Sequence, residues 1–77
     1  MSTEDLFESI VIETNEIKLA SFLKWAGIAV TGGQAKLLVE QGYILVNGEE
    51  EKRRGRKLTV GDIVEVRGLG IYQVTKE

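Results

Sequence analysis

Two short amphipathic stretches, separated by only a few residues, constrain the fold of this chain more than any other feature of its sequence. The first has the i, i+3, i+4, i+7 spacing of a helix in Leu19, Phe22, Leu23 and Ala26. The second carries its apolar stripe in Ala35, Leu38 and Val39. Helices this short are marginal alone in water, so each must pack on the other and on a sheet.

The ends of both helices have local signals. Gly27 follows the first stripe and Gly42 the second, and glycine is the usual left-handed stop after a helix. The segment Thr31-Gly32-Gly33-Gln34 has the spacing of a capping box. We expect the Thr31 hydroxyl to accept from the Gln34 backbone N–H, and the Gln34 side chain to reach back to the N–H of Thr31.

Strand signals lie on both sides of the helices. Runs rich in β-branched and aromatic residues predict strands at Phe7 to Ile12, Tyr43 to Val46, Ile63 to Val66 and Ile71 to Val74. Asn47-Gly48 predicts a hairpin turn. We expect the first and last strands to lie side by side, because either alone would leave an unpaired apolar edge. The predicted fold is α+β, with two short helices on a small, mostly antiparallel sheet. Residues 1–77 form one domain, in which 1–16 is an N-terminal strand extension.

Composition excludes several classes of function. The 77 residues include no cysteine and no histidine, which removes disulfides, thiolate ligands and the commonest metal ligand and general base. No histidine is present to activate Ser9 or Ser21. The longest apolar run, Trp25 to Val30, is far too short to span a membrane. We therefore expect no enzymatic activity, cofactor, metal, small-molecule substrate or membrane partner, and we expect a cytoplasmic monomer.

Positive charge gathers in one short segment. Five of the six residues from Lys52 to Lys57 are cationic, although the net charge of the chain is -2. Residues 1–16 contribute five acids and no base, which leaves ten bases and seven acids, or +3, for residues 17–77. Screening over about 8 Å makes local charge dominate over net charge, so such a cluster attracts polyanions. Nucleic acid is the first partner to consider.

The order of these signals resembles the S4 RNA-binding domain. The resemblance covers roughly Lys18 to Val66, and its most specific pieces are Phe22-Leu23, Gly42 with Val46-Asn47-Gly48, and Gly61-Asp62-Ile63-Val64-Glu65-Val66. The added N-terminal strand and the basic run make the chain still more similar to the small free-standing bacterial S4-like proteins of the YaaA and YbcJ type. In that family the domain is the whole protein.

The resemblance implies an αL-shaped surface, made by the two helices and the adjoining hairpin loop with its basic run, that binds structured RNA such as ribosomal or transfer RNA through phosphate and shape contacts. Carried over residue by residue, it indicates these cations: Lys18, Lys36, Lys52, Arg53, Arg54, Arg56 and Lys57. Many S4 domains have a basic pair where this chain has Gly32-Gly33. There, approachable backbone N–H groups at a helix start favour a phosphate.

Other interpretations remain open from the sequence. The basic run could be a solvated loop partly neutralised by Glu49 to Glu51, and the two glycines could serve only helix-start flexibility. Trp25 could stack on a base or simply pack. The alternatives to RNA binding are a protein-interaction adaptor whose acidic segments face a basic partner, and duplex DNA binding by the same patch. We expect the acids before residue 17 to be structural and to lie away from the basic loop.

Overall fold

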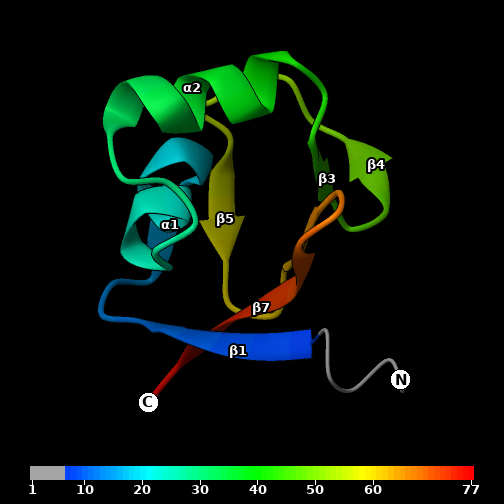
Figure 1. Cartoon of the computed structure of the whole chain (residues 1–77). Coiled ribbons are helices and arrows are strands. Elements are labelled where there is room, and N and C mark those ends of the chain that lie inside the picture. Colours follow the sequence, from blue (N-terminus) through cyan, green and yellow to red (C-terminus); the bar gives the residue numbers. More distant parts are fainter. Residues whose placement is uncertain (1–6) are drawn as a thin grey trace.

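The structure of the chain is a computed structural model that describes residues 7–77, in which two short helices lie against two small sheets (Figure 1). In chain order the elements are β1 (Phe7–Ile12), β2 (Glu16–Lys18), α1 (Leu19–Trp25), α2 (Gly32–Glu40), β3 (Ile44–Val46), β4 (Glu49–Glu50), β5 (Lys57–Thr59), β6 (Ile63–Val66) and β7 (Gly70–Lys76). The larger sheet has the order β1-β7-β6-β3-β4, and β2 pairs with β5 in the smaller one. This arrangement confirms the predicted α+β class.

The pairing of the first and last strands is confirmed. β1 runs parallel to β7, with Phe7 opposite Ile71 and Ile12 opposite Lys76. The pairs β6–β7, β3–β6 and β3–β4 are antiparallel, so the larger sheet is mostly antiparallel as expected. The two-stranded sheet was not predicted. It joins Glu16–Lys18 to Lys57–Thr59 in an antiparallel register.

The helices and both sheets share one apolar core. Both predicted stripes point into it: Leu19, Phe22 and Leu23 of α1 and Ala35 and Val39 of α2 are buried. From the sheets come Ile12, Ile44, Val46, Leu58, Val64, Val66, Tyr72 and Val74. The short helices are therefore stabilised by packing, as the sequence required. Neither helix in residues 7–77 has the length and apolar character to cross a bilayer.

The predicted hairpin turn forms at Asn47-Gly48. Both residues have positive φ, 52° and 86°, which is the geometry of the tight turn that suits a twisted hairpin. The Asn47 side chain also has a role that the turn signal did not indicate. Its Oδ1 accepts the Ile63 N–H at 2.9 Å, and its Nδ2 donates to Asp62 Oδ1 at 3.1 Å. Asn47 therefore ties the β3–β4 turn to the turn before β6.

The cap of α2 forms with one correction. Thr31 is the N-cap, and its hydroxyl accepts the Gln34 N–H at 3.1 Å, as predicted. The Gln34 Oε1, however, accepts from the N–H of Val30 at 2.6 Å and not from that of Thr31. The return bond is made one residue upstream. It fixes the entry into the helix as well as its first turn.

Candidate nucleic-acid interface

The basic segment forms the connection from β4 of the larger sheet to β5 of the smaller one. It was expected on a hairpin, but the hairpin strand β4 ends at Glu50, and the next strand, β5, pairs with β2 and not with β4. We name residues 51–57 the basic loop. Within it the Arg56 N–H donates to the Arg53 carbonyl at 3.1 Å, so the backbone makes a tight turn with Arg54 and Gly55 at its tip.

A buried carboxylate holds this loop in place. Glu51 is only 7% exposed, and its N–H donates to the Ile44 carbonyl at 3.0 Å, which anchors it to the sheet. Its Oε2 accepts the backbone N–H and Nε of Arg53 at 3.2 and 3.0 Å. Its Oε1 accepts Arg53 Nη2 at 3.1 Å and Arg56 Nη1 at 2.9 Å. Hydrogen bonds from Arg53 and then Arg56 lower the pKa of Glu51 from 4.5 to about 2.

The backbone of the loop caps the first helix. Lys18 occupies the N-cap position of α1, and its side chain makes no capping hydrogen bond. Instead, the Leu19 N–H donates to the Arg56 carbonyl at 2.8 Å and the Ala20 N–H to the Arg54 carbonyl at 3.0 Å. Carbonyls of the basic loop therefore satisfy donors that a helix start would otherwise leave free. The contact also brings the loop directly against Lys18.

Lys18 and Lys57 form a cationic pair across the small sheet. They are direct partners in the antiparallel register of β2 and β5, and both are exposed. Glu16, two residues before Lys18, places its Oε1 3.6 Å from Lys57 Nζ. The expectation that every acid before residue 17 lies away from the basic loop is wrong for Glu16. Glu16 lies there because β2 pairs with β5, which the sequence did not predict. The Glu16 carboxylate offsets the repulsion between the opposed Lys18 and Lys57.

The predicted cations therefore differ in how they are held. Arg53 and Arg56 are engaged by Glu51. Lys52 and Lys57 make only long, exposed ion pairs, of 3.5 Å to Glu50 and 3.6 Å to Glu16. Such pairs are weak and easily exchanged for a ligand. Within residues 7–77, no ion pair or side-chain hydrogen bond engages the three remaining predicted cations, Lys18, Lys36 and Arg54, all of which are exposed.

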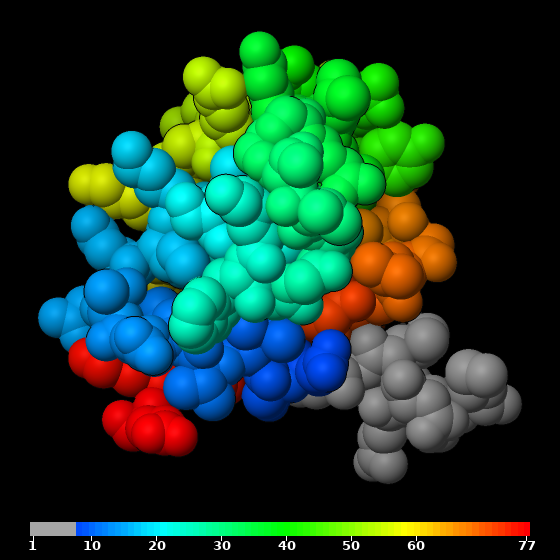
Figure 2. All heavy atoms as spheres, turned by 60° about the vertical axis from the view of Figure 1, so that its left-hand side comes forward, coloured from blue at the N-terminus to red at the C-terminus, as the bar shows by residue number. Residues whose placement is uncertain are grey.

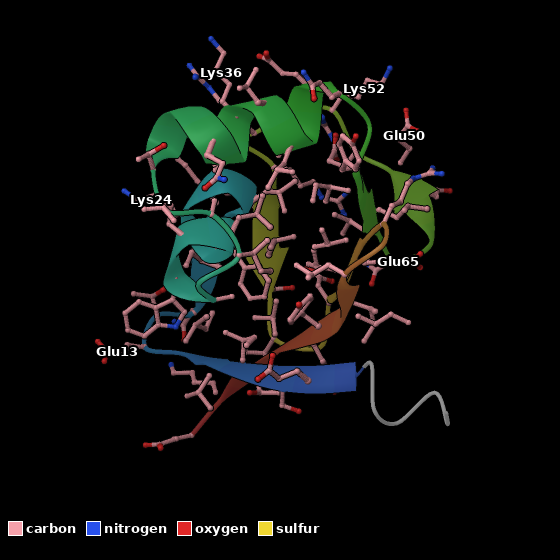
Figure 3. The ribbon with its side chains drawn as sticks, in the orientation of Figure 1. Glu13, Lys24, Lys36, Glu50, Lys52 and Glu65 are labelled. Atoms are coloured by element: carbon pink, nitrogen blue, oxygen red, sulfur yellow. The ribbon has the colours of Figure 1, made fainter. Side chains whose placement is uncertain are left out.

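The second helix contributes to the same side of the molecule. Figure 3 shows Lys36 and Lys52 projecting at the α2 side of the structure. At the start of α2, Gly32 and Gly33 are exposed, and a Cβ built on Gly33 would meet only Thr31 Oγ1, at 3.9 Å. A phosphate can therefore approach the backbone there. No hydrogen bond or ion pair within residues 7–77 joins these glycines or Lys36 to the basic loop.

Glu51 is the residue of this surface that the sequence did not single out. It lies in a run of three glutamates, and its neighbours Glu49 and Glu50 are exposed. The spacing of two and five residues to Arg53 and Arg56 was the only signal available. The glutamates do neutralise part of the charge of the basic loop, as expected. Glu51, the buried one, makes the contacts to both Arg53 and Arg56.

Comparison with known proteins gives a consistent result. The family model described as S4 domain matches residues 10–75. The "Probable ribosome maturation protein RlbA" of Bacillus subtilis is 49% identical over 65 residues, which are 84% of this chain and 92% of that protein. The "Putative RNA-binding protein YbcJ" of Escherichia coli is 31% identical over 58 residues, 75% of this chain and 83% of that protein.

A solved structure resembles the fold as well. The solution structure of YbcJ from E. coli, described as having an αL motif involved in RNA binding, superimposes with a TM-score of 0.64 and 28% sequence identity. The match covers 91% of this chain and 86% of that one. The sequence and the arrangement of elements thus lead to the same group of proteins.

Proposed function

The chain belongs to the S4 domain family, and from this premise we propose that it is an RNA-binding protein that recognises structured ribosomal RNA. Its relatives support the two parts of this proposal separately. One bears a name for RNA binding and the other a name for ribosome maturation. We further propose that the protein acts in the cytoplasm as a monomer and as a binding protein without catalysis.

The observation that carries the proposal is that some residues of the basic loop hold its structure while others expose their charge. Glu51 holds Arg53 and Arg56, and the loop carbonyls bind the start of α1. This fixes the backbone from which Arg54 and Lys57 project beside Lys18. Exposed cations on a backbone that is held in place suit recognition of RNA by shape and phosphate position. Lys36, Lys52 and the open start of α2 at Gly32 and Gly33 extend the proposed surface.

Phosphate contacts predict a definite salt dependence. If Lys18, Arg54, Lys57 and one of Lys36 or Lys52 each neutralise a phosphate, about four counterions are released. The logarithm of the binding constant should then fall with the logarithm of salt concentration at a slope of about -3 to -4. Shape recognition adds selectivity for folded RNA but does not alter this slope.

The test combines a titration with a search for the natural target. Binding of a ribosomal RNA fragment is measured at several KCl concentrations for the parent and for Arg54→Ala, with Lys76→Ala as the control. Lys76 is an exposed cation and the last residue of β7, whose C-terminal end lies at the opposite end of the molecule from α2 (Figure 1). Arg54→Ala should lower affinity about 5- to 10-fold and reduce the slope by about one. Equal effects of the two substitutions would contradict the proposed surface.

Crosslinking in cells followed by sequencing identifies the RNA. Enrichment of ribosomal RNA, at positions protected by the parent and not by Arg54→Ala, is the expected result. Enrichment of transfer RNA would keep RNA binding and correct the target. If duplex DNA displaced the bound RNA as effectively as folded RNA does, the surface would recognise only the negative charge of a nucleic acid.

A further inference from the structure

The only tryptophan of the chain lies on a different part of the surface, in a fixed orientation. Trp25, the last residue of α1, is 54% exposed. Its indole Nε1–H nevertheless donates to the Val11 carbonyl of β1 at 2.7 Å. This hydrogen bond holds the ring against the first strand while leaving much of it in contact with solvent. Large aromatic side chains that are both exposed and held in place are typical of binding surfaces.

Two hollows flank this tryptophan. One is lined by Val11, Ile12, Glu13, Trp25, Lys76 and Glu77, and the other by Ile12, Glu13, Thr14, Ile17 and Trp25. Trp25 and Glu13 border both hollows, so a single ligand could contact the indole and the carboxylate together. Figure 2 shows this side of the molecule, with the end of α1 above the blue strand β1 and the red end of β7 beside it. We name this area the Trp25 surface.

The charge of the Trp25 surface is opposite to that of the basic loop. Glu13 and Glu77 contribute carboxylates, and within residues 7–77 neither makes an ion pair. The ammonium group of Lys76 donates to Asn15 Oδ1 at 2.6 Å. In Figure 3, Glu13 lies at the far end of the molecule from Lys36 and Lys52. The carboxylates repel phosphate, so a nucleic acid bound at the basic loop has no electrostatic reason to extend here.

The strand beside Trp25 lies at an edge of its sheet. β1 is at the edge of the larger sheet and has β7 as its one strand partner within the described part of the chain. Of the outward-facing backbone groups of β1, the Val11 carbonyl is bound by Trp25. That carbonyl is therefore occupied, but elsewhere along an edge strand an extended peptide can form main-chain hydrogen bonds.

We propose that the Trp25 surface binds an arginine-rich extended segment of a protein partner. An arginine side chain would lie over the exposed face of the Trp25 ring, since guanidinium groups stack favourably on aromatic rings. The Glu13 carboxylate would accept hydrogen bonds from the same guanidinium. The protein would then hold RNA on one side and a basic protein segment on the other.

Fluorescence provides a direct test, because Trp25 is the single tryptophan. The purified chain is titrated, without RNA, with a peptide of alternating arginine and threonine about a dozen residues long. A saturable change in Trp25 emission is expected, and a peptide with glutamate in place of arginine should give none. Glu13→Lys should weaken binding of the arginine peptide at least about fivefold. Glu49→Lys, an exposed acid on β4, is the matched control.

The outcomes separate this proposal from RNA binding. If Glu13→Lys leaves peptide affinity unchanged, or if both glutamate variants weaken it equally, the Trp25 surface is not the binding site. Two results together would assign this surface to RNA and overturn the proposal. They are a saturable change in Trp25 emission on titration with ribosomal RNA, and a loss of RNA affinity in the Trp25→Phe variant. If the proposal is correct, the Glu13→Lys variant binds RNA with the affinity of the parent. This expectation does not depend on the effect of Arg54→Ala on RNA binding.

Discussion

Replacing Glu51 with glutamine should cost stability that can be estimated from the structure. The arginines lower the pKa of Glu51 from 4.5 to about 2. That change corresponds to about 3.4 kcal/mol of folding free energy, at about 1.36 kcal/mol per tenfold change in proton affinity. The Arg53 side chain is 76% exposed, so solvent screens part of the interaction. We therefore expect Glu51→Gln to lower the free energy of unfolding by about 2 kcal/mol at pH 7.

The sign of the pH dependence follows from the lowered pKa. The folded state binds the Glu51 proton less readily than the unfolded state does, so the stabilisation is present in full above the unfolded pKa of 4.5. It declines as pH falls and is lost as pH passes through about 2, where the folded carboxyl takes up its proton. The difference in unfolding free energy between parent and Glu51→Gln should therefore shrink between these two values. More than half of it should be lost by about pH 3.

Urea unfolding followed by circular dichroism, at pH 7 and at steps down to about pH 3, measures this difference directly. Subtracting the unfolding free energy of Glu51→Gln from that of the parent at each pH removes the contributions of the titratable groups that the two proteins share. Glu49→Gln is the matched control, because Glu49 is exposed and makes no ion pair within residues 7–77. It should change stability by less than about 0.5 kcal/mol. A difference for Glu51→Gln that stays constant with pH would refute the assignment of its cost to the ionised carboxylate.

Three further substitutions test the surroundings of the interface. Gly33→Glu should weaken RNA binding about fivefold or more without loss of fold, measured by titration and circular dichroism, because a Cβ there meets only Thr31 Oγ1, at 3.9 Å, while the added charge repels phosphate. Thr31→Ala should cost about 1 kcal/mol of unfolding free energy in urea by removing the cap of α2, and RNA affinity of the folded protein should be unchanged. Asn47→Ala should cost about 1 to 3 kcal/mol, since alanine loses both hydrogen bonds and tolerates positive φ poorly. Asn47→Gly loses the same hydrogen bonds but adopts positive φ freely, so it should cost less.

The parts of the fold that the sequence predicted are those with local or periodic signals. The stripe containing Phe22 and Leu23 and the capping segment at Thr31 indicate where α1 and α2 lie, although packing stabilises both helices. The β1–β7 pairing was predicted because two apolar strands each lacked a partner. The β2–β5 sheet has three residues per strand and joins segments about forty residues apart. No pattern within either segment indicates such a contact.

The site shows a similar limit at the level of single residues. In sequence, Arg53, Arg54 and Arg56 are equivalent members of one basic run. The tight turn closed by the Arg56 N–H places Arg53 and Arg56 around Glu51 and leaves Arg54 at the tip. Because the two outer arginines hold the loop that caps α1, replacing all three by alanine would remove binding and loop structure together. Arg54→Ala alone removes an exposed charge from an intact loop, and for that reason its effect on RNA affinity can be interpreted.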